Sequence, residues 1–197
     1  MGNEPTAKNC WAPEIFYDED NLRYLIFWAT TIDGAFPETY NPSDDNNHRI
    51  YYVSTQDFVT YTPTALFYDP GFNCIDATLN KDGSQYVMFI KNETKVPTAQ
   101  KNIRIATASA AGGPYGAASA SITPTGVWVE GPTAMQIGQD WYLYYDEYTL
   151  GKMGGQKSSD DMQTWQDITN QLSFPSGVRH GTIFTVPTNI LIPLQQL

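Results

Sequence analysis

Two acidic residues hold equivalent places in a pattern that the sequence repeats. Asp76 and Glu130 each open a short apolar segment, which leads through a glycine-containing turn into an aromatic-rich segment. Two converging carboxyl groups can break a glycosidic bond, because one donates a proton to the leaving oxygen while the other acts at the sugar or at water. A neighbouring carboxylate and partial burial raise the pKa of the proton donor. We therefore expect an ionised Asp76 and a raised pKa for Glu130; the alternative is that both acids cap surface turns.

The elements that position these acids have the two-residue period of β-strands. Five segments are rich in aromatic and β-branched residues and are bounded by Asn, Asp, Gly or Pro, which predicts strands. They are Arg23–Ala29, Arg49–Ser54, Gln85–Ile90, Asn102–Thr107 and Asp140–Tyr145. No segment has a convincing helical period. The Ala/Ser/Gly-rich stretch 106–121 is broken by Gly112-Gly113-Pro114, which predicts a strand followed by a loop.

Hairpin units of similar order begin at Trp11, Ile75 and Glu130. The acidic and basic positions Asp76, Glu130 and Arg179 follow one another at steps of roughly 50 residues, which is typical of β-propeller blades. The first strand of each blade lines the central channel, so Asp76 and Glu130 should converge at one end of it. The fold predicted is all-β and a propeller; the alternative is a β-sandwich of unrelated hairpins.

The motifs of the chain resemble glycoside hydrolase family 43 in their order and spacing. They are Trp11-Ala12-Pro13-Glu14, Ile75-Asp76-Ala77-Thr78-Leu79 with Lys81-Asp82-Gly83, Val129-Glu130-Gly131-Pro132, Arg179-His180-Gly181, and the element from Ser159-Asp160 to Trp165. The resemblance implies a five-bladed β-propeller and a relationship to β-xylosidases, α-L-arabinofuranosidases and arabinanases.

The resemblance also implies roles for five residues. Glu130 matches the general acid, and Asp76 matches the aspartate that tunes the pKa of that acid. Arg179 matches an arginine near the substrate. His180 matches a histidine near the channel axis that contacts calcium or water, and Trp11 falls where an aromatic ring could form a sugar platform. The alternatives are a strand-end arginine, a packed histidine and a core tryptophan.

The family's general base, an aspartate of the first blade, has no counterpart here. Glu4 is the sole acid before Trp11. The resemblance therefore implies that residues 1–197 form a single, incomplete propeller domain of about three and a half blades: blades two to four and a first strand of blade five at Gly181–Val186. We expect such a chain to hydrolyse pentosides slowly or not at all, and to self-associate through its open edges.

The function implied is inverting acid/base hydrolysis of arabinofuranosyl or xylosyl linkages in plant cell-wall polysaccharides, with the base missing. The partner is carbohydrate. No cofactor is required, although the resemblance admits a structural calcium ion in the channel. A non-catalytic sugar-binding or vestigial propeller and an interaction module without a sugar site are the alternatives. Invertase-like propellers usually carry Glu-Cys where this chain has Glu130-Gly131.

Composition excludes other partners. The net charge of −10 argues against nucleic acid and against an anionic membrane surface. No apolar run approaches the ~18 residues of a membrane span.

The cysteines and one histidine carry no site prediction. Cys10 and Cys74 fit no zinc motif and are expected to be free buried thiols, with a disulfide as the alternative. His48, beside Asn and Asp residues, is expected in solvent. Residues 1–5 lack the basic end and apolar stretch expected of a signal peptide, so this chain does not indicate a compartment. The family resemblance implies a secreted or periplasmic enzyme.

Overall fold

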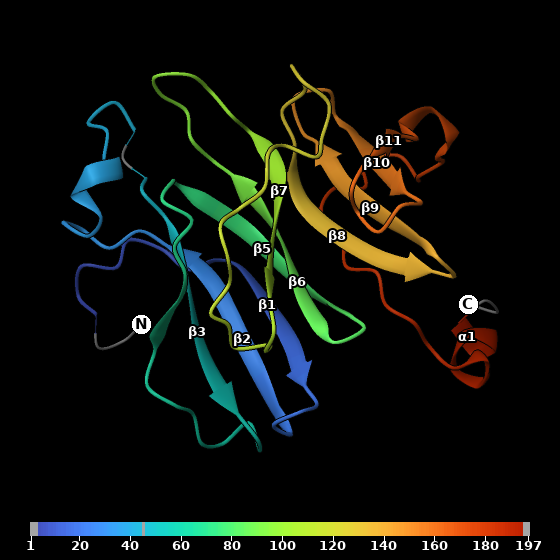
Figure 1. Ribbon diagram of the computed structural model, residues 1–197, viewed down its shortest axis with the longest axis horizontal. Coiled ribbons are helices and arrows are strands. Elements are labelled where there is room, and N and C mark those ends of the chain that lie inside the picture. The colour runs from blue at the N-terminus through green and yellow to red at the C-terminus, as the bar shows by residue number, and fades with distance from the viewer. Residues whose placement is uncertain (1–3, 45, 195–197) are drawn as a thin grey trace.

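The computed structural model describes residues 4–44 and 46–194, which fold into three antiparallel sheets (Figure 1). The first sheet contains β1 (Trp11–Asp18), β2 (Arg23–Thr30), β3 (Arg49–Thr55) and β4 (Ala65–Tyr68). The second contains β5 (Cys74–Asp82), β6 (Gln85–Asn92) and β7 (Asn102–Ala108). The third contains β8 (Glu130–Ile137), β9 (Asp140–Glu147), β10 (Lys152–Ser158) and β11 (Gln166–Asp167). The helical elements are η1 (Pro37–Thr39), η2 (Thr169–Gln171) and α1 (Thr188–Leu194).

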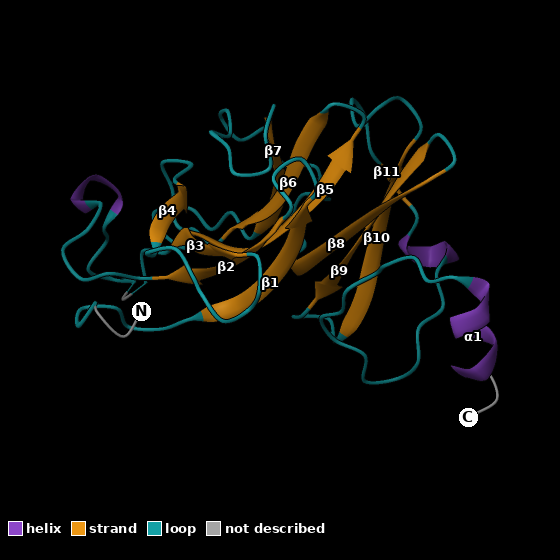
Figure 2. Ribbon diagram, turned by 90° about the horizontal axis from the view of Figure 1, so that it is seen from below, coloured by secondary structure: helices purple, strands orange, loops and turns teal. Residues whose placement is uncertain are grey.

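Each sheet is an up-and-down meander in which consecutive strands pair, as propeller blades require. The five strands predicted from their alternating pattern are all present, as β2, β3, β6, β7 and β9. The first strands β1, β5 and β8 lie side by side, with β5 in the middle (Figure 2). The propeller prediction is confirmed for these three blades.

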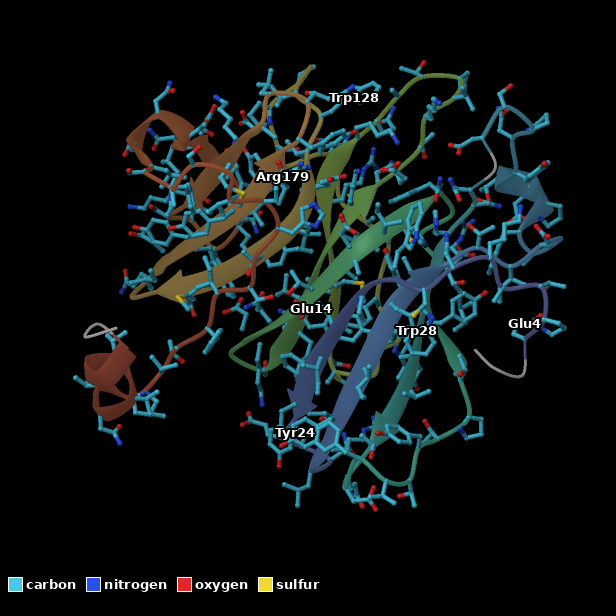
Figure 3. The ribbon with its side chains drawn as sticks, turned by 180° about the vertical axis from the view of Figure 1, so that it is seen from behind. Glu4, Glu14, Tyr24, Trp28, Trp128 and Arg179 are labelled. Atoms are coloured by element: carbon cyan, nitrogen blue, oxygen red, sulfur yellow. The ribbon has the colours of Figure 1, made fainter. Side chains whose placement is uncertain are left out.

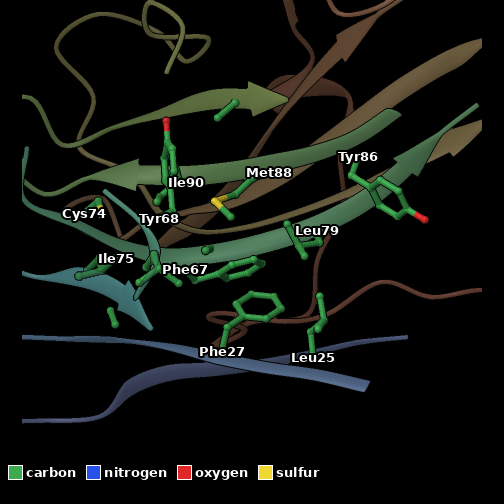
Figure 4. Close-up of a cluster of buried hydrophobic side chains, with 14 of the residues drawn as sticks. Leu25, Phe27, Phe67, Tyr68, Cys74, Ile75, Leu79, Tyr86, Met88 and Ile90 are labelled. Carbon is green, nitrogen blue, oxygen red and sulfur yellow. The ribbon is translucent and has the colours of Figure 1, made fainter. Parts of the chain in front are cut away.

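Two hydrophobic layers hold the blades face to face. Between the first and second blades, Leu25 and Phe27 of β2 pack with Leu79 of β5 and Met88 of β6 (Figure 4). Between the second and third, Phe89 packs with a cluster that includes the fully buried Trp141, Leu143 and Tyr145 of β9. Period-two alternation explains both layers, because successive side chains of a strand point to opposite faces of its sheet.

The inner strands share a bulge that fixes the residues at their starts. Register shifts lie between Trp11 and Glu14, between Ile75 and Thr78, and between Glu130 and Thr133. In each bulge the second residue has a left-handed backbone: Ala12 (φ 45°), Asp76 (φ 52°) and Gly131 (φ 56°). In this register, Glu130 therefore corresponds to Trp11 and Ile75, whereas Asp76 corresponds to Ala12 and Gly131.

The structure corrects two expectations about elements and confirms a third. Residues 181–187 carry no strand, so the predicted first strand of another blade at Gly181–Val186 is wrong. The segment crosses β8 instead, where the Ile183 amide donates to Thr133 Oγ1 at 3.0 Å. A short helix, α1, follows it, although no helical period was predicted. The stretch after β7 is irregular as predicted, and it lies along β7 in place of a fourth strand: the Gly116 and Ser119 amides donate to Thr107 and Ile105 carbonyls.

Two side-chain expectations also change. Cys10 and Cys74 are free thiols as expected, but Cys10 is exposed and only Cys74 is buried. His48 is fully buried instead of solvated, because its ring bonds to Asn9 at 2.8 Å and to Asn73 at 3.0 Å. None of the helices in the described parts of the chain is long and apolar enough to cross a membrane.

Candidate active site

A cavity of about 230 Å³ lies where the starts of the inner strands meet the segment after Arg179. Its walls come from all three blades and from the chain that follows β11. Its lining includes Ala12, Glu14, Asp76, Gly131, His180 and Thr182. Figure 3 shows Glu14 and Arg179 toward the middle of the molecule, where these segments meet. The inner strands thus deliver their first residues to one end of the blades, as predicted.

Glu130 stands beside this cavity among three cationic side chains. Its Oε2 accepts a hydrogen bond from Lys91 Nζ at 2.9 Å. Its Oε1 lies 2.9 Å from His180 Nε2 and 3.6 Å from the Arg179 guanidinium. Glu130 is therefore held from both of its oxygens by groups that favour its charged form.

The pKa of Glu130 is shifted in the direction opposite to that predicted. Burial alone would raise the pKa of Glu130, but the hydrogen bond from His180 and the charge of Lys91 outweigh it and lower this pKa to about 2. The hydrogen bond to Glu130 raises the pKa of His180, against a smaller opposing effect of burial. At neutral pH, Glu130 is a carboxylate, and a proton held by the Glu130–His180 pair lies on the imidazole and not on the carboxyl group.

Asp76 is buried beneath Glu130, with only 8% of its surface exposed. Its Oδ2 accepts a hydrogen bond of 2.9 Å from the Gly131 amide, which ties the bulge of β5 to that of β8. Burial raises the pKa of Asp76, and the Gly131 hydrogen bond and Lys91 oppose that shift. Asp76 and Glu130 do converge, and one ligand atom each of Asp76, Glu130 and His180 lie within 4.8 Å of one another.

Arg179 is anchored by a residue that sequence reasoning did not select. Its Nε donates to Oδ2 of Asp146, a fully buried residue of β9 that pairs with Glu130 in the sheet. The guanidinium itself remains half exposed and reaches toward Glu130. This arrangement suits a group that meets substrate, since Arg179 presents further donors beyond those that Asp146 occupies.

Trp11 lies at the same end of the blades but is not among the residues that line the cavity. Its side chain is 45% exposed, so the core alternative is wrong. The indole rests on the buried His48 ring, with ring centroids 4.7 Å apart. Burial lowers the pKa of His48, which leaves a neutral ring beneath the indole. The sugar-platform role of Trp11 stays a prediction.

Two further groups at the site were missed. Lys91, almost fully buried at the end of β6, touches Glu130 although 39 residues separate them in the chain. Glu14 belongs to the Trp-Ala-Pro-Glu motif and lines the cavity, where it accepts a hydrogen bond from Thr182 Oγ1 at 3.2 Å. Burial raises the pKa of Glu14. The motif was the only sequence signal for Glu14, and Lys91 had none.

Asp76, Glu130 and His180 could hold a cation by their spacing. A calcium ion prefers six to eight oxygen ligands, and this set offers two carboxylates and one imidazole. The ammonium of Lys91 and the guanidinium of Arg179 also lie against Glu130. The donor set therefore fits calcium poorly.

Comparison with known proteins identifies the chain's relatives. Residues 3–189 match the glycosyl hydrolase 43-related family, described as a probable glycosyl hydrolase domain. An α-L-arabinofuranosidase of Bifidobacterium longum is 34% identical over 96 residues, which are 46% of this chain and 9% of that protein.

Solved structures share the fold. An α-L-arabinofuranosidase of Lactobacillus brevis superposes with a TM-score of 0.59 at 19% identity, over 84% of this chain and 56% of that one. An α-L-arabinofuranosidase of Podospora anserina, in complex with cellotriose, gives 0.62 at 9% identity, over 86% and 52%. The chain thus spans about half the length of these two structures. Because the family match covers almost its whole length, the chain belongs to the glycosyl hydrolase 43-related family.

Proposed function

We propose that this chain carries the acid-bearing part of a glycosidase active site that releases arabinofuranosyl residues from plant cell-wall polysaccharide with inversion. The main support for this proposal is the position of Glu130, which is the first residue of inner strand β8 and lies beside Asp76 and His180. The relatives support arabinofuranose as the released sugar, because the curated relative and two solved structures are named α-L-arabinofuranosidases. β-Xylosyl linkages are the second substrate class to test.

In this proposal Glu130 protonates the leaving oxygen, and His180 is the store of that proton. The imidazole Nε2 lies 2.9 Å from Glu130 Oε1, so moving its proton along this hydrogen bond gives a neutral carboxylic acid and a neutral imidazole. The acid then gives the proton to the glycosidic oxygen as the bond to the sugar breaks. Arg179 contacts the substrate, and Asp76 orients the start of β8 through the Gly131 amide.

The attacking water needs a different carboxylate. Acid and base in an inverting enzyme stand roughly 6.5–9.5 Å apart, which leaves room for a water molecule. Oxygens of Asp76 and Glu130 lie within 4.8 Å of each other, so Asp76 is too close to Glu130 to serve as the base. The proposal places the base outside this cluster, and losing a positioned base costs about 10²–10⁴-fold in rate.

The test uses an arabinofuranosyl xylo-oligosaccharide, whose sugar leaving group depends on protonation, with formate added as an external base. Formate should raise arabinose release by the full chain about tenfold or more. The Glu130→Gln variant should show no such increase. NMR of the first-formed product should give the inverted anomer. A xylosyl oligosaccharide in parallel decides between the two sugars.

Three results would contradict the proposal. Equal rates for Glu130→Gln and the unmodified chain would remove the acid role. A product of retained configuration would remove inversion. Rapid turnover without formate that Glu14→Gln abolishes would not contradict the proposal, and it would identify Glu14 as the base. Oligosaccharide binding in calorimetry without turnover under any condition would favour the non-catalytic alternative.

A further inference from the structure

Two aromatic side chains outside the group that holds the Glu130 carboxylate stand near this acid. Trp128 lies two residues before β8, and Tyr148 follows β9 directly. Their ring centroids are 6.3 Å apart at an angle of 47°. Trp128 is 38% exposed, and Figure 3 places it beyond Arg179, toward the upper edge of the molecule in that view. The pair therefore offers apolar surface to solvent at the acid's end of the blades.

Two buried lysines support these rings from below. Lys101 Nζ lies 5.9 Å from the centroid of the Trp128 ring, and Lys91 Nζ lies 4.8 Å from that of Tyr148. Both lysines are at most 5% exposed. The amide of the residue after Trp128 is also tied down, because it donates to the Lys101 carbonyl at 3.0 Å. Ring and backbone are thus fixed together before any ligand arrives.

Glu93 joins the two lysines, and Lys91 joins them to the acid. Lys91 Nζ lies 2.6 Å from Glu93 and 2.9 Å from Glu130, whereas Lys101 Nζ contacts the Glu93 carboxylate and donates to its backbone carbonyl at 2.8 Å. The cluster holds two cations and two anions and is neutral as a whole. One buried cluster therefore sets the position of the aromatic pair relative to the Glu130 carboxylate.

This chemistry selects a neutral ligand with an apolar face. The charges of Lys91 and Lys101 are balanced by Glu93 and Glu130 inside the cluster, so the surface of the rings carries no net positive charge that would attract an anionic ligand. A pyranose chair with equatorial hydroxyls has a flat face of C–H groups and a polar rim, which suits amphipathic aromatic surface. A puckered furanose ring offers no such face. Rigid rings also lose little conformational entropy on binding, which favours affinity.

We propose that Trp128 and Tyr148 form the subsite for the leaving-group sugar, a pyranose unit of the polysaccharide backbone such as β-linked xylose. The assignment to the leaving-group side rests on the proposed function, in which Glu130 protonates the oxygen between the two sugars. The lysine that holds Glu130 also carries Tyr148, so the rings and the proton donor flank the same bond. An unbranched xylo-oligosaccharide should then bind here without any arabinofuranosyl group.

The test is binding, and it requires no turnover. Calorimetry with xylotriose and NMR of the indole N–H signals are measured on the full chain, with the Trp128 signal assigned from its loss in Trp128→Phe. Xylotriose should shift that signal. Trp128→Ala should weaken binding about fivefold or more, and Trp128→Phe, which keeps a ring, should weaken it less. Free arabinose should leave the signal in place.

Tyr61→Ala is the matched control, since Tyr61 is also half exposed but lies in the loop after β3, at the opposite end of the first blade. It should bind xylotriose as the unmodified chain does, and melting curves establish that each variant is folded. Unchanged affinity in Trp128→Ala, or no shift of the Trp128 signal, would overturn the subsite. Equal rates for Glu130→Gln and the unmodified chain in the formate experiment would overturn the acid role of Glu130 and leave this binding result intact.

Discussion

Glu130 owes its charge to side chains from two distant segments. Lys91 reaches it from β6, and His180 and Arg179 reach it from the chain beyond β11. Each is a cation or a hydrogen-bond donor toward a carboxylate oxygen, and together they outweigh the effect of burial on the pKa of Glu130. At the scale of single residues, the site is therefore an ion-pair network whose weak point is the removal of one partner.

The Glu130–His180 pair makes stability depend on pH in both directions. The pKa of His180 is raised from its ordinary 6.5, so its contribution is complete below 6.5 and is lost as the pH rises through the folded-state pKa. The pKa of Glu130 is lowered from 4.5 to about 2, so its contribution is complete above 4.5 and is lost as the pH falls toward 2. The melting temperature of His180→Gln should fall furthest below that of the unmodified chain between these ordinary values. A difference that stays constant from acid to alkaline pH would contradict this.

Replacement of Lys91 should be costly, because it leaves Glu93 and Glu130 without their shared cation. Lys91→Met should lower the free energy of unfolding by roughly 3–5 kcal/mol, measured by urea denaturation. Lys81→Met is the control: Lys81 also lies over a tyrosine ring and 2.5 Å from a carboxylate, Glu19, but that pair is solvent-exposed. Its loss should cost far less than the loss of Lys91, because an ion pair in water contributes little to stability. Equal decreases in the free energy of unfolding in Lys91→Met and Lys81→Met would show that the buried ion pairs stabilise the fold no more than the exposed one.

Calcium should not stabilise the fold through Asp76, Glu130 and His180. Lys91 and His180 already occupy the Glu130 oxygens, and the remaining donors are too few for this ion. The melting temperature should therefore be the same in calcium and in chelator, for the unmodified chain and for Asp76→Asn. A calcium-dependent rise that Asp76→Asn removes would establish the cation site implied by the family resemblance.

At the scale of elements, the shared bulge of β1, β5 and β8 determines which side chain reaches the site. One bulge position holds Trp11, Ile75 or Glu130, and the next has a left-handed backbone. Only the third blade places an acid at the first of these positions, and only the second places one at the next. The two acids therefore meet as diagonal neighbours across adjacent inner strands, joined by the Gly131 amide.

Gly131 is needed both for its backbone and for the space above it. A Cβ atom there would lie 2.7 Å from His180 Cγ, and φ is +56°. Gly131→Ala should lower the free energy of unfolding by roughly 1–3 kcal/mol and displace His180 from Glu130. Urea denaturation measures the change in stability, and the NMR signals of the His180 ring report its displacement. Ala12→Gly, at the same place in β1, should change stability by less than about 1 kcal/mol. Unmoved His180 signals in Gly131→Ala would contradict the packing argument.

Local pattern predicted most of the elements and only part of the site. Strand β9 follows from alternating residues whose apolar set one blade face buries, whereas β6 of the middle blade is a continuous apolar run buried on both faces. The pattern of Gly181–Val186 is equally strand-like, but a strand needs a hydrogen-bonded neighbour, and this segment crosses β8 instead. The charge of Glu130 could not be predicted, because Lys91 reaches it only through the packing of two blades.

At the scale of the whole molecule, the first blade has one covered face and one open face. Phe16 of β1 packs toward the second blade, whereas its neighbours Ile15 and Tyr17 on the opposite face are about half exposed. Leu172 and Phe174 cover part of the corresponding outer face of the third blade, next to Gly155 and Tyr144. The first blade thus leaves an apolar sheet face open at its end of the stack.

That open face should cause self-association. Light scattering after size exclusion should show a concentration-dependent mass above that of one chain, because burying exposed apolar side chains is favourable. Ile15→Lys should return the protein to a single chain. Leu150→Lys changes an equally exposed apolar residue in the β9–β10 hairpin and should have no effect on the mass. A monomer at all concentrations would mean that this face tolerates water.

The hydrogen bond from Thr182 to Glu14 joins residues 168 positions apart in the chain. Contacts between residues so far apart in the chain close a very long loop, which costs conformational entropy. They are therefore expected to form late in folding, after the three blades have brought the two segments close together. The cavity walls meet at this contact, and His180 lies two residues before it. A polypeptide whose three blades have formed but whose last segment is still unattached therefore has its core but lacks this cavity. On the proposed function, binding of an arabinofuranosyl group in the cavity would then report the final step of folding, later than any signal from the buried tryptophan of β9.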